Sequence, residues 1–559
     1  MLRLAPPLAL IVLAVPLAFG VLGTVLPALG YLPALGGTRL TLAPFAELLA
    51  QPGIVRSSIQ ALLIGLATTA VSLVLVAGFV CAWYGTRAFA FIQHLVSPLL
   101  AVPHAAAAFG FAFMIAPSGY LARLVSPWAT GWERPPDWLI VNDPAGLALI
   151  AGLVLKEVPF LLLVTLAALP QVPATRAQEL SQSLGYGLLA GFMFTVWPAL
   201  YRQIRLAVFA VIAYASANVD VAIILGPTTP ETLPVRLVGW MNDPDLSMRF
   251  MACAGAVLQI GVTATAIAIW VAMERAMHIL AERVCETGRR FRRDGAMRML
   301  AGAAMTVQAL LVFGGLAILA LWSVSGLWQF PDALPANLSL RSWKQSLPVL
   351  AGPLATTIIV GVAATAISLA IALACLQREN ETGRTGGNRA LALVYLPLLV
   401  PQIGFLFGLQ LLLVAADADA NWAALIGAHV IFVLPYVFLS LSAPWRAYDR
   451  RYEAIAAALG ATTGRIFWRV RLPMLTRAVL AASAVGFAVS VGQYLPTLLV
   501  GAGRFPTITT EAVALGSGGN RRVIGVYAFL QMMLPFIGFV LAGLVPALLF
   551  RNRRAIRGV

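Results

Sequence analysis

Long runs of apolar residues, separated by short polar, proline-rich or glycine-rich breaks, follow one another along the whole chain. A helix needs about 20 mostly apolar residues to cross roughly 30 Å of hydrocarbon, because no unpaired backbone amide can face lipid. About twelve segments meet this requirement, so the pattern predicts an all-α polytopic membrane protein. The expected spans are residues 6–30, 57–83, 92–116, 145–169, 203–225 and 248–273, followed by 299–322, 349–375, 390–415, 421–443, 478–500 and 524–549.

The first span could be mistaken for a secretory signal, since Arg3 stands ahead of it. Its apolar run from Leu4 to Leu29 is longer than the apolar core of a signal peptide, which has about 7–15 residues. We therefore expect a membrane helix that is retained.

The polar breaks reveal an internal repeat. Gly185, Phe192 and Pro198 recur, at a constant offset of 275 residues, as Gly460, Phe467 and Pro473. The register extends into the next apolar span, where Asn218, Ile224 and Gly226 stand opposite Gln493, Leu499 and Gly501, and the upstream segment GLATTAVSL at residues 65–73 matches GVAATAISL at 361–369. A duplicated transmembrane unit explains both matches. We expect a first half over residues 1–273, a cytoplasmic linker over 274–298 and a second half over 299–559.

Composition and charge agree with a membrane protein and argue against a nucleic-acid-binding one. Apolar residues make up 60% of the chain and charged residues 11%, whereas soluble domains have about 25% charged residues. The net charge is +16, and a cytoplasmic N-terminus would place about 26 of the 38 Lys and Arg residues on cytoplasmic segments. This positive-inside bias predicts that both termini and both repeated motifs lie in the cytoplasm, with the arginines setting orientation and meeting anionic lipid.

Catalytic chemistry is not expected in this chain. A phosphate-binding loop needs Gly-x4-Gly-Lys-Ser/Thr, yet the only lysines are Lys156 and Lys344, preceded by Leu155 and Trp343. The four histidines and four cysteines lack the spacing of a metal site. We therefore expect no enzyme activity, no metal and no bound cofactor, and any ATP must be used by another polypeptide.

The repeated motif predicts a docking helix. Residues 453–459 form an alanine-rich stretch with good helix propensity, which Gly460 can end because it tolerates a positive φ. Pro473 stands near the base of the following span, where a missing amide hydrogen costs little. A small, rigid helix of this kind suits docking into a groove on another protein, although an ordinary interfacial connector would have the same local sequence.

At these residues the chain resembles the permease subunits of ABC importers, whose cytoplasmic EAA loop has a Glu-Ala-Ala start, a glycine and a later Leu-Pro. The second copy fits at Glu453, Ala454, Gly460, Ala461, Phe467, Leu472 and Pro473, but Ala454 stands where the family often has a second acid. The first copy fits at Glu179, Leu184, Gly185, Phe192 and Pro198, while Leu180, Tyr186 and Trp197 replace the expected Ala, Ala and Leu. The resemblance implies two tandem six-helix, MetI-like halves, and the departures imply that coupling through the first half is weaker or adapted to one side of its partner.

In having two fused six-helix halves, the chain resembles the permeases for ferric iron and thiamine, and most of all the fused permease of the YnjBCD-type system. The segment TITTEAVALGSGGNRRVIGVYA, at residues 507–528, carries this last likeness. The resemblance implies that both docking loops contact two copies of a cytoplasmic ATPase and that a periplasmic binding protein delivers a small solute in the bacterial inner membrane. The solute itself does not follow from the sequence.

Several polar residues stand within apolar spans, where an unpaired charge costs several kcal/mol. Lys156 and Glu157 lie near the middle of the fourth span, and Asn218 and Asp220 in the fifth. Adjacent residues on a helix point about 100° apart, so at most one of Lys156 and Glu157 lines a path, and Lys156 could pair with Asp220. In the second half Phe432 and Val433 occupy the positions of the first pair, whereas Gln493 and Tyr494 correspond to Asn218 and Val219.

The candidate translocation path therefore comprises Lys156, Glu157, Asn218, Asp220, Gln493 and Tyr494. Each of these residues could instead have only a structural role, as an ion pair or hydrogen-bonding group between helices. A second class of function is also compatible with the spans. A twelve-helix secondary transporter could use Lys156, Glu157 and Asp220 to carry protons or ions.

Overall fold

In a computed structural model of the chain, all residues are described except 1, 97–98, 100, 384–386, 517 and 552–559. Helices account for the regular structure of the described residues, and nine of them are long and apolar enough to cross a membrane, or up to twelve if each sharply bent pair is one span. The prediction of an all-α polytopic membrane protein is confirmed.

The nine spanning helices are α1 (Ala5–Ala28), α3 (Ile54–Trp83), α5 (His104–Ile115) continued by α6 (Tyr120–Val125), α7 (Leu147–Ala168), α13 (Met248–Glu286), α14 (Gly295–Ser323), α15 (Arg341–Thr382), α18 (Trp422–Ala447) and α25 (Arg521–Leu549). The bent pairs are α9 (Leu188–Thr195) with α10 (Trp197–Ser216), α16 (Asn388–Leu399) with α17 (Gln402–Ala415), and the run α20 (Thr463–Ile466), η5 (Phe467–Arg471) and α21 (Leu472–Met474) with α22 (Thr476–Val491). The remaining helices are α2 (Ala43–Ala50), α4 (Arg87–Val96), α8 (Ala174–Ser183), α11 (Asp220–Leu225), α12 (Leu233–Met241), α19 (Arg451–Ala458), α23 (Leu495–Gly501) and α24 (Ile508–Leu515).

Four of the predicted spans are broken rather than continuous. The span predicted at 390–415 turns by 88° between α16 and α17, because Val400 precedes Pro401 and takes an extended conformation. The span predicted at 92–116 is likewise divided, since α4 ends at Val96 and α5 begins after Pro103. The spans predicted at 203–225 and 478–500 are interrupted at residues 217–219 and 492–494, so the continuous helices expected there are wrong.

The break before α11 has a local cause. The side-chain oxygen of Asn218 accepts hydrogen bonds from the backbone amides of Val221 and Ala222, at 3.0 and 3.2 Å. An asparagine in this position starts a new helix rather than continuing the old one, because it satisfies amides that would otherwise lack an acceptor. The matching break lies just before Pro496, which stands in the first turn of α23 and needs no amide partner there.

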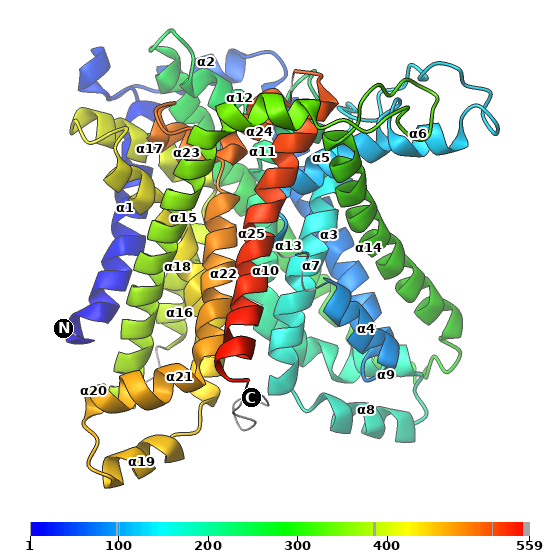
Figure 1. Cartoon of the computed structure of the whole chain (residues 1–559), viewed down its shortest axis with the longest axis vertical. Helices are drawn as coiled ribbons and strands as arrows, with labels where there is room; N and C mark the ends of the chain where they lie inside the picture. Colours follow the sequence, from blue (N-terminus) through cyan, green and yellow to red (C-terminus); the bar gives the residue numbers. More distant parts are fainter. Residues whose placement is uncertain (1, 97–98, 100, 384–386, 517, 552–559) are drawn as a thin grey trace.

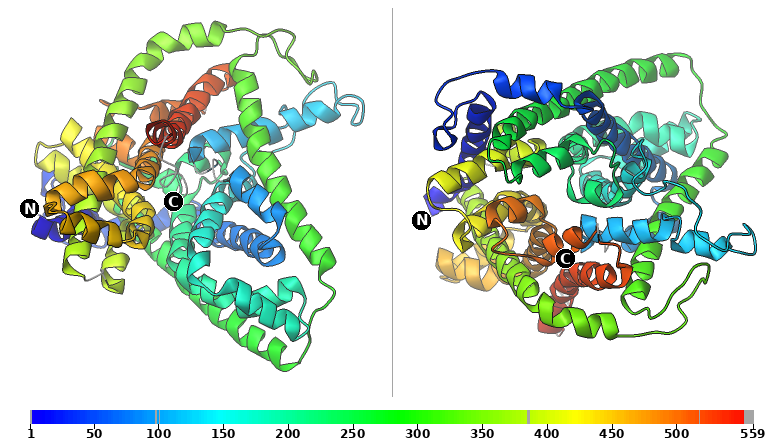
Figure 2. Two further views of the ribbon diagram at one scale, coloured as in Figure 1. Left: turned by 60° about the horizontal axis from the view of Figure 1, so that its bottom comes forward. Right: turned by 90° about the horizontal axis from the view of Figure 1, so that it is seen from above.

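The first helix of each half packs against the other half. α1 lies along α17 and α14 lies along α5, at opposite sides of the molecule (Figure 2). Glycines permit both crossings: a Cβ on Gly110 would come within 2.7 Å of the Gly315 carbonyl oxygen, and a Cβ on Gly408 would overlap the backbone of Gly20 and Gly23. Thr24 also accepts a hydrogen bond from the Gly408 amide at 2.9 Å. The two halves are therefore interlocked, although each is continuous in sequence.

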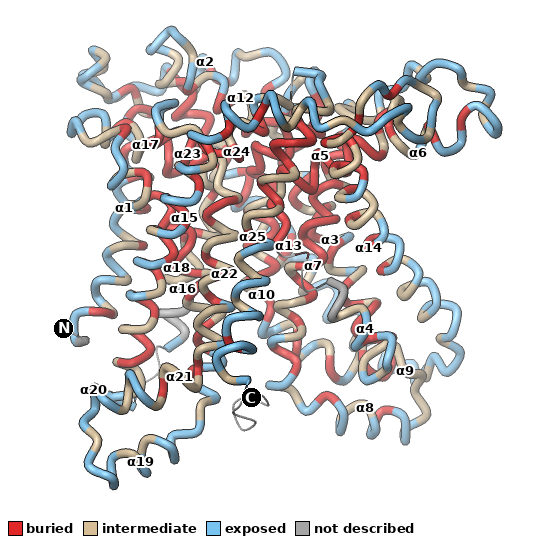
Figure 3. The backbone as a smooth tube through the Cα atoms, viewed as in Figure 1, coloured by how far each residue is buried: buried red, intermediate tan, exposed pale blue. Residues whose placement is uncertain are grey.

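The helices converge at one end and diverge toward the other (Figure 1). Buried residues gather at the convergent end, where α5, α17, α23 and α24 meet (Figure 3). The N-terminus, the end of α25 and the segments around α8 and α19 all lie at the divergent end (Figure 1). The repeat therefore places its two copies at the same end of the protein.

Candidate docking segments and intramembrane polar cluster

Each copy of the repeated motif folds as a short helix that a glycine ends. In the second copy Gly460 has a φ of +80°, and its amide and that of Ala461 donate to the carbonyls of Ala457 and Ala456 at 2.9 and 3.0 Å. In the first copy Gly185 has a φ of +81°, and the same two hydrogen bonds run to Gln182 and Ser181. Both are Schellman caps, which favour glycine because other residues are strained at positive φ.

The helix of the second copy, α19, has no buried residue. Ile455 on this helix and Leu459 at its C-cap are exposed, as is Trp468 further along the segment. Apolar side chains gathered at an exposed helix are typical of a surface that binds another protein. The first copy is similar, because Leu180 and Leu184 on α8 and its cap are exposed. We call residues 174–198 the first docking segment and residues 449–474 the second docking segment.

One buried arginine anchors the second docking segment. Arg471 is 3% exposed, forms an ion pair with Glu453, and donates a hydrogen bond to the side chain of Gln377 on α15. Its guanidinium also stacks over Trp445 and Tyr448, at 5.4 and 5.6 Å from the ring centroids. The arginine lies on η5, a five-residue π-helical turn, and such turns are frequent at functional sites.

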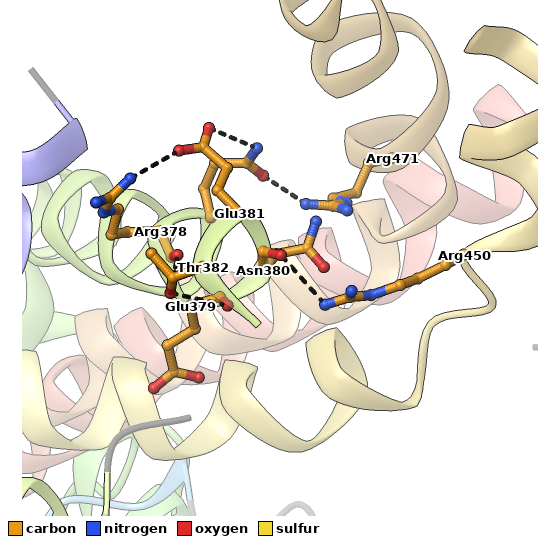
Figure 4. Close-up of polar contacts among 8 residues, drawn as sticks. Arg378, Glu379, Asn380, Glu381, Thr382, Arg450 and Arg471 are labelled. Atoms are coloured by element: carbon orange, nitrogen blue, oxygen red, sulfur yellow. Dashed lines mark hydrogen bonds and ion pairs between the residues drawn. The ribbon is translucent and has the colours of Figure 1, made fainter. Parts of the chain in front are cut away.

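Further contacts hold the base of this segment to the end of α15 (Figure 4). Arg446 forms an ion pair with Glu379 at 3.0 Å, and Arg450 donates to the Asn380 carbonyl at 3.5 Å. Partial burial raises the pKa of Tyr448 to about 12, and the neighbouring Glu453 carboxylate adds to this shift. The phenol therefore stays neutral beside the ion pair, which leaves Arg471 as the positive partner of Glu453.

The first docking segment lacks this anchor. Glu179 is exposed and forms no ion pair within the part of the chain that the structure describes. The position that corresponds to Arg471 is Val196, a fully buried apolar residue. Phe192 is also fully buried, against Tyr84 at a centroid distance of 5.2 Å, whereas its counterpart Phe467 is partly exposed beside Trp445 and Trp468. Pro198 stands in the first turn of α10, and Pro473 stands in the first turn of α21, the short helix that precedes α22.

The structure brings three of the six polar path candidates, Glu157, Asp220 and Tyr494, together with residues of both halves. Glu157 on α7 lies 3.5 Å from the His104 ring nitrogen, and the His104 ring stacks on Tyr214 at 4.7 Å. Tyr214 interacts electrostatically with Asp220 and Glu157 of its own half and with Tyr436 of the second half. Tyr494 interacts with Asp220 in the same way. Neither His104, Tyr214 nor Tyr436 was recognised from the sequence, because single residues within apolar spans give no local signal.

Other path candidates have structural partners. Lys156 donates to the Leu99 carbonyl at 3.1 Å, and the Lys156–Asp220 ion pair considered above is not among the ion pairs of the described residues. Asn218 donates to Asp220 at 2.8 Å while it caps α11. Gln493 accepts a hydrogen bond from Thr497 through its backbone carbonyl at 3.0 Å. Lys156 and Glu157 therefore have different partners, as expected for neighbours on one helix.

These features define an all-helical membrane protein in which both copies of the repeated motif form a short helix with a glycine cap, at the same end of the molecule. Comparison with known proteins identifies the class. The chain is 30% identical to the inner membrane ABC transporter permease protein YnjC of Escherichia coli K12 over 459 residues, which cover 82% of each protein. The chain therefore belongs to the family of ABC transporter permeases.

Shorter matches agree with this assignment. The molybdenum transport system permease protein ModB of Mycobacterium tuberculosis is 34% identical over 119 residues, which are 19% of this chain and 45% of ModB. The putrescine transport system permease protein PotI of Escherichia coli K12 is 28% identical over 168 residues, which are 28% of this chain and 59% of PotI. No family model matches the chain.

Proposed function

We propose that this chain is the transmembrane subunit of an ATP-driven importer in the inner membrane. Its two docking segments each contact one copy of a cytoplasmic ATPase, and a periplasmic binding protein delivers the solute at the opposite end. The single observation that carries this proposal is the pair of matched segments, each with an exposed helix and a Schellman glycine, at one end of the molecule. On this proposal both termini are cytoplasmic.

Two docking helices at matched positions suit a partner that works as a pair. When two ATPase copies close on nucleotide, they would draw the docking segments together and tilt the helices attached to them. The helices converge at the far end and diverge at the docking end (Figure 1), so this motion would close the docking end and open the other. Membership of the ABC permease family favours this ATP-driven cycle over coupling to an ion gradient.

We further propose that the solute passes between the halves, along α7, α10 and α11 of the first and α18, α22 and α23 of the second. Glu157, Asp220 and Tyr494 would line this path together with Tyr214 and Tyr436. Partly exposed tyrosines from both halves interact with the two buried carboxylates, which gives the contact between the halves a polar character. The partial relatives are named for molybdenum and for putrescine transport, two chemically different solutes, so selection of the solute belongs to the binding protein.

A Gly460→Val variant tests the proposal. Valine is strained at a φ of +80°, so the cap of α19 should distort and less ATPase should co-purify with the permease. Gly503→Val is the matched control, because Gly503 has a φ of +75° and equally free surroundings but lies after α23, at the opposite end. Unchanged ATPase retention together with normal uptake in the Gly460 variant would refute the assignment of the docking segment.

A further inference from the structure

The linker between the halves is folded against the first docking segment. Helix α13 continues to Glu286 and α14 begins at Gly295, so only residues 287–294 are non-helical. Arg290 donates to the Leu184 carbonyl at the end of α8, and its guanidinium stacks over Tyr186 at 5.1 Å. The Arg290 carbonyl in turn accepts from the Gly187 amide at 3.2 Å. The linker thus contacts the docking segment on both sides of its glycine cap.

Asp294 adds a hydrogen bond between the linker and the first docking segment. It stands at the N-cap of α14, where an aspartate normally accepts hydrogen bonds from its own helix, yet its side chain makes no such bond. Its carboxylate instead accepts from the Leu189 amide at 2.7 Å, in the first turn of α9. Aspartate is favourable at this position because the first amides of a helix have no internal acceptor and carry partial positive charge.

Gly187 allows the first docking segment and the linker to pack closely together. A Cβ on Gly187 would lie 2.5 Å from the Phe291 carbonyl oxygen and 2.6 Å from the Asp294 carboxylate, distances that no side chain tolerates. Phe291 also approaches Phe194 on α9, with ring centroids 6.3 Å apart. Gly187 is therefore needed for the close approach of two segments that are about a hundred residues apart in sequence.

The linker passes directly into a helix of the second half. Arg298, in the first turn of α14, donates to the Ala82 carbonyl at 3.0 Å and stacks over Trp83 at 5.6 Å, while the Trp83 indole donates back to the Arg298 carbonyl at 3.0 Å. These contacts fix the start of α14 to the end of α3. A continuous set of contacts therefore runs from the first docking segment, through the linker, to α14.

We propose that residues 287–294 are a working part of the first docking segment, and that Asp294 is a positioning residue that fixes α9 and connects this segment to α14. The proposal rests on the function proposed above. In the second docking segment Arg471 ties the docking helix to α15 from within the same half. The first docking segment has Val196 at that position, and the linker supplies the missing anchor from outside.

The test uses the assembled permease and ATPase. Asp294→Ala removes the acceptor for the Leu189 amide, whereas Asp294→Asn keeps a side-chain oxygen that can accept the same bond. Glu286→Ala, in the exposed last turn of α13, is the matched control. We expect Asp294→Ala to speed hydrogen exchange at α9 about fivefold, the usual effect of losing one helix cap, and to lower solute uptake per ATP hydrolysed. Asn should restore both, and Glu286→Ala should change neither.

A second measurement needs no variant. In the wild-type protein, hydrogen exchange at residues 187–189 and at residues 287–294 should slow together when the ATPase binds, because the two stretches form one unit. Protection of the docking segment alone, or an Asp294→Ala variant that matches the Glu286 control, would overturn the inference. Gly460→Val is measured in parallel: if it loses ATPase while Asp294→Ala behaves normally, the linker proposal fails and the proposed function stands.

Discussion

The ion pair between Glu453 and Arg471 should decide whether α19 is ordered before the ATPase binds. Helix α19 has eight residues, none of them buried, and isolated helices shorter than about 12 residues are unstable in water. Its order in the free permease must therefore come from side-chain contacts at its ends. Glu453 is the residue of α19 whose side chain reaches the anchored Arg471.

The strength of the Glu453–Arg471 ion pair depends on how far the two side chains are buried. An exposed ion pair contributes about 0.2–1 kcal/mol, whereas a hydrogen bond to a charged group contributes about 1.5–3 kcal/mol. Arg471 is 3% exposed and Glu453 is 19% exposed, so the pair is closer to the second case. We expect a coupling free energy of about 2 kcal/mol, which is roughly a 30-fold change in the local opening constant of α19.

The assay is hydrogen exchange at the α19 amides of the ATPase-free permease, in a double-mutant cycle of Glu453→Ala and Arg471→Met. Glu453→Ala leaves a buried guanidinium without its carboxylate, so it should be the more damaging single change. Adding Arg471→Met should recover part of the loss, because it removes the unpaired charge and keeps an apolar chain between Trp445 and Tyr448. Glu282→Ala on α13 is the control, since its contact with His278 is exposed on both sides and shares no partner with Arg471. No recovery in the double variant and a coupling below about 0.5 kcal/mol would show that the pair behaves like a surface pair.

Two further predictions concern the membrane-spanning part. Gly408→Leu should lower the thermal unfolding midpoint and cost about 3 kcal/mol or more of stability, because a Cβ at Gly408 would overlap the backbone of α1. Gly427→Leu is the control and should leave the midpoint unchanged, because a Cβ at Gly427 meets no atom within 4 Å. Equal midpoints for the two variants would contradict the interlocked crossing. Glu157→Gln should lower solute uptake about tenfold without changing ATPase retention, because Glu157 pairs with His104 on α5 and belongs to neither docking segment. Normal uptake in proteoliposomes would remove Glu157 from the path.

The apolar pattern predicted an all-α polytopic membrane protein, because each span leaves a long, contiguous signal. It did not predict where four spans break. Averaged hydropathy carries no information on which polar atoms satisfy a free amide, and the break at 217–219 depends on a single side-chain oxygen of Asn218. Pro401 was visible in the sequence, but proline within a membrane helix more often kinks the helix than divides it.

The repeat predicted a short helix with a glycine cap in each copy, because a Schellman cap is local and recurs at a fixed offset. The same reasoning could not predict the side-chain contacts that anchor the two docking segments. Arg471 is one of many arginines in the sequence, and its partner Gln377 lies 94 residues away. Asp294 and Leu189 are 105 residues apart, and the sequence around each residue gives no indication of the contact. Long-range pairs of this kind can be recognised only when the fold has brought them together.

The exchange of first helices explains why the two docking segments are anchored differently. Helix α14 belongs to the second half by sequence but packs on α3 and α5 of the first half, so the chain that leaves α13 needs only residues 287–294 to reach it. This short connection must pass the first docking segment, where it supplies Arg290 and Asp294 as contacts. The second docking segment has no such connection beside it among the described residues and draws its anchor from the end of α15 instead. The first docking segment, which has the buried Val196 at the position of Arg471, is thus held by the linker instead of by an arginine of its own half.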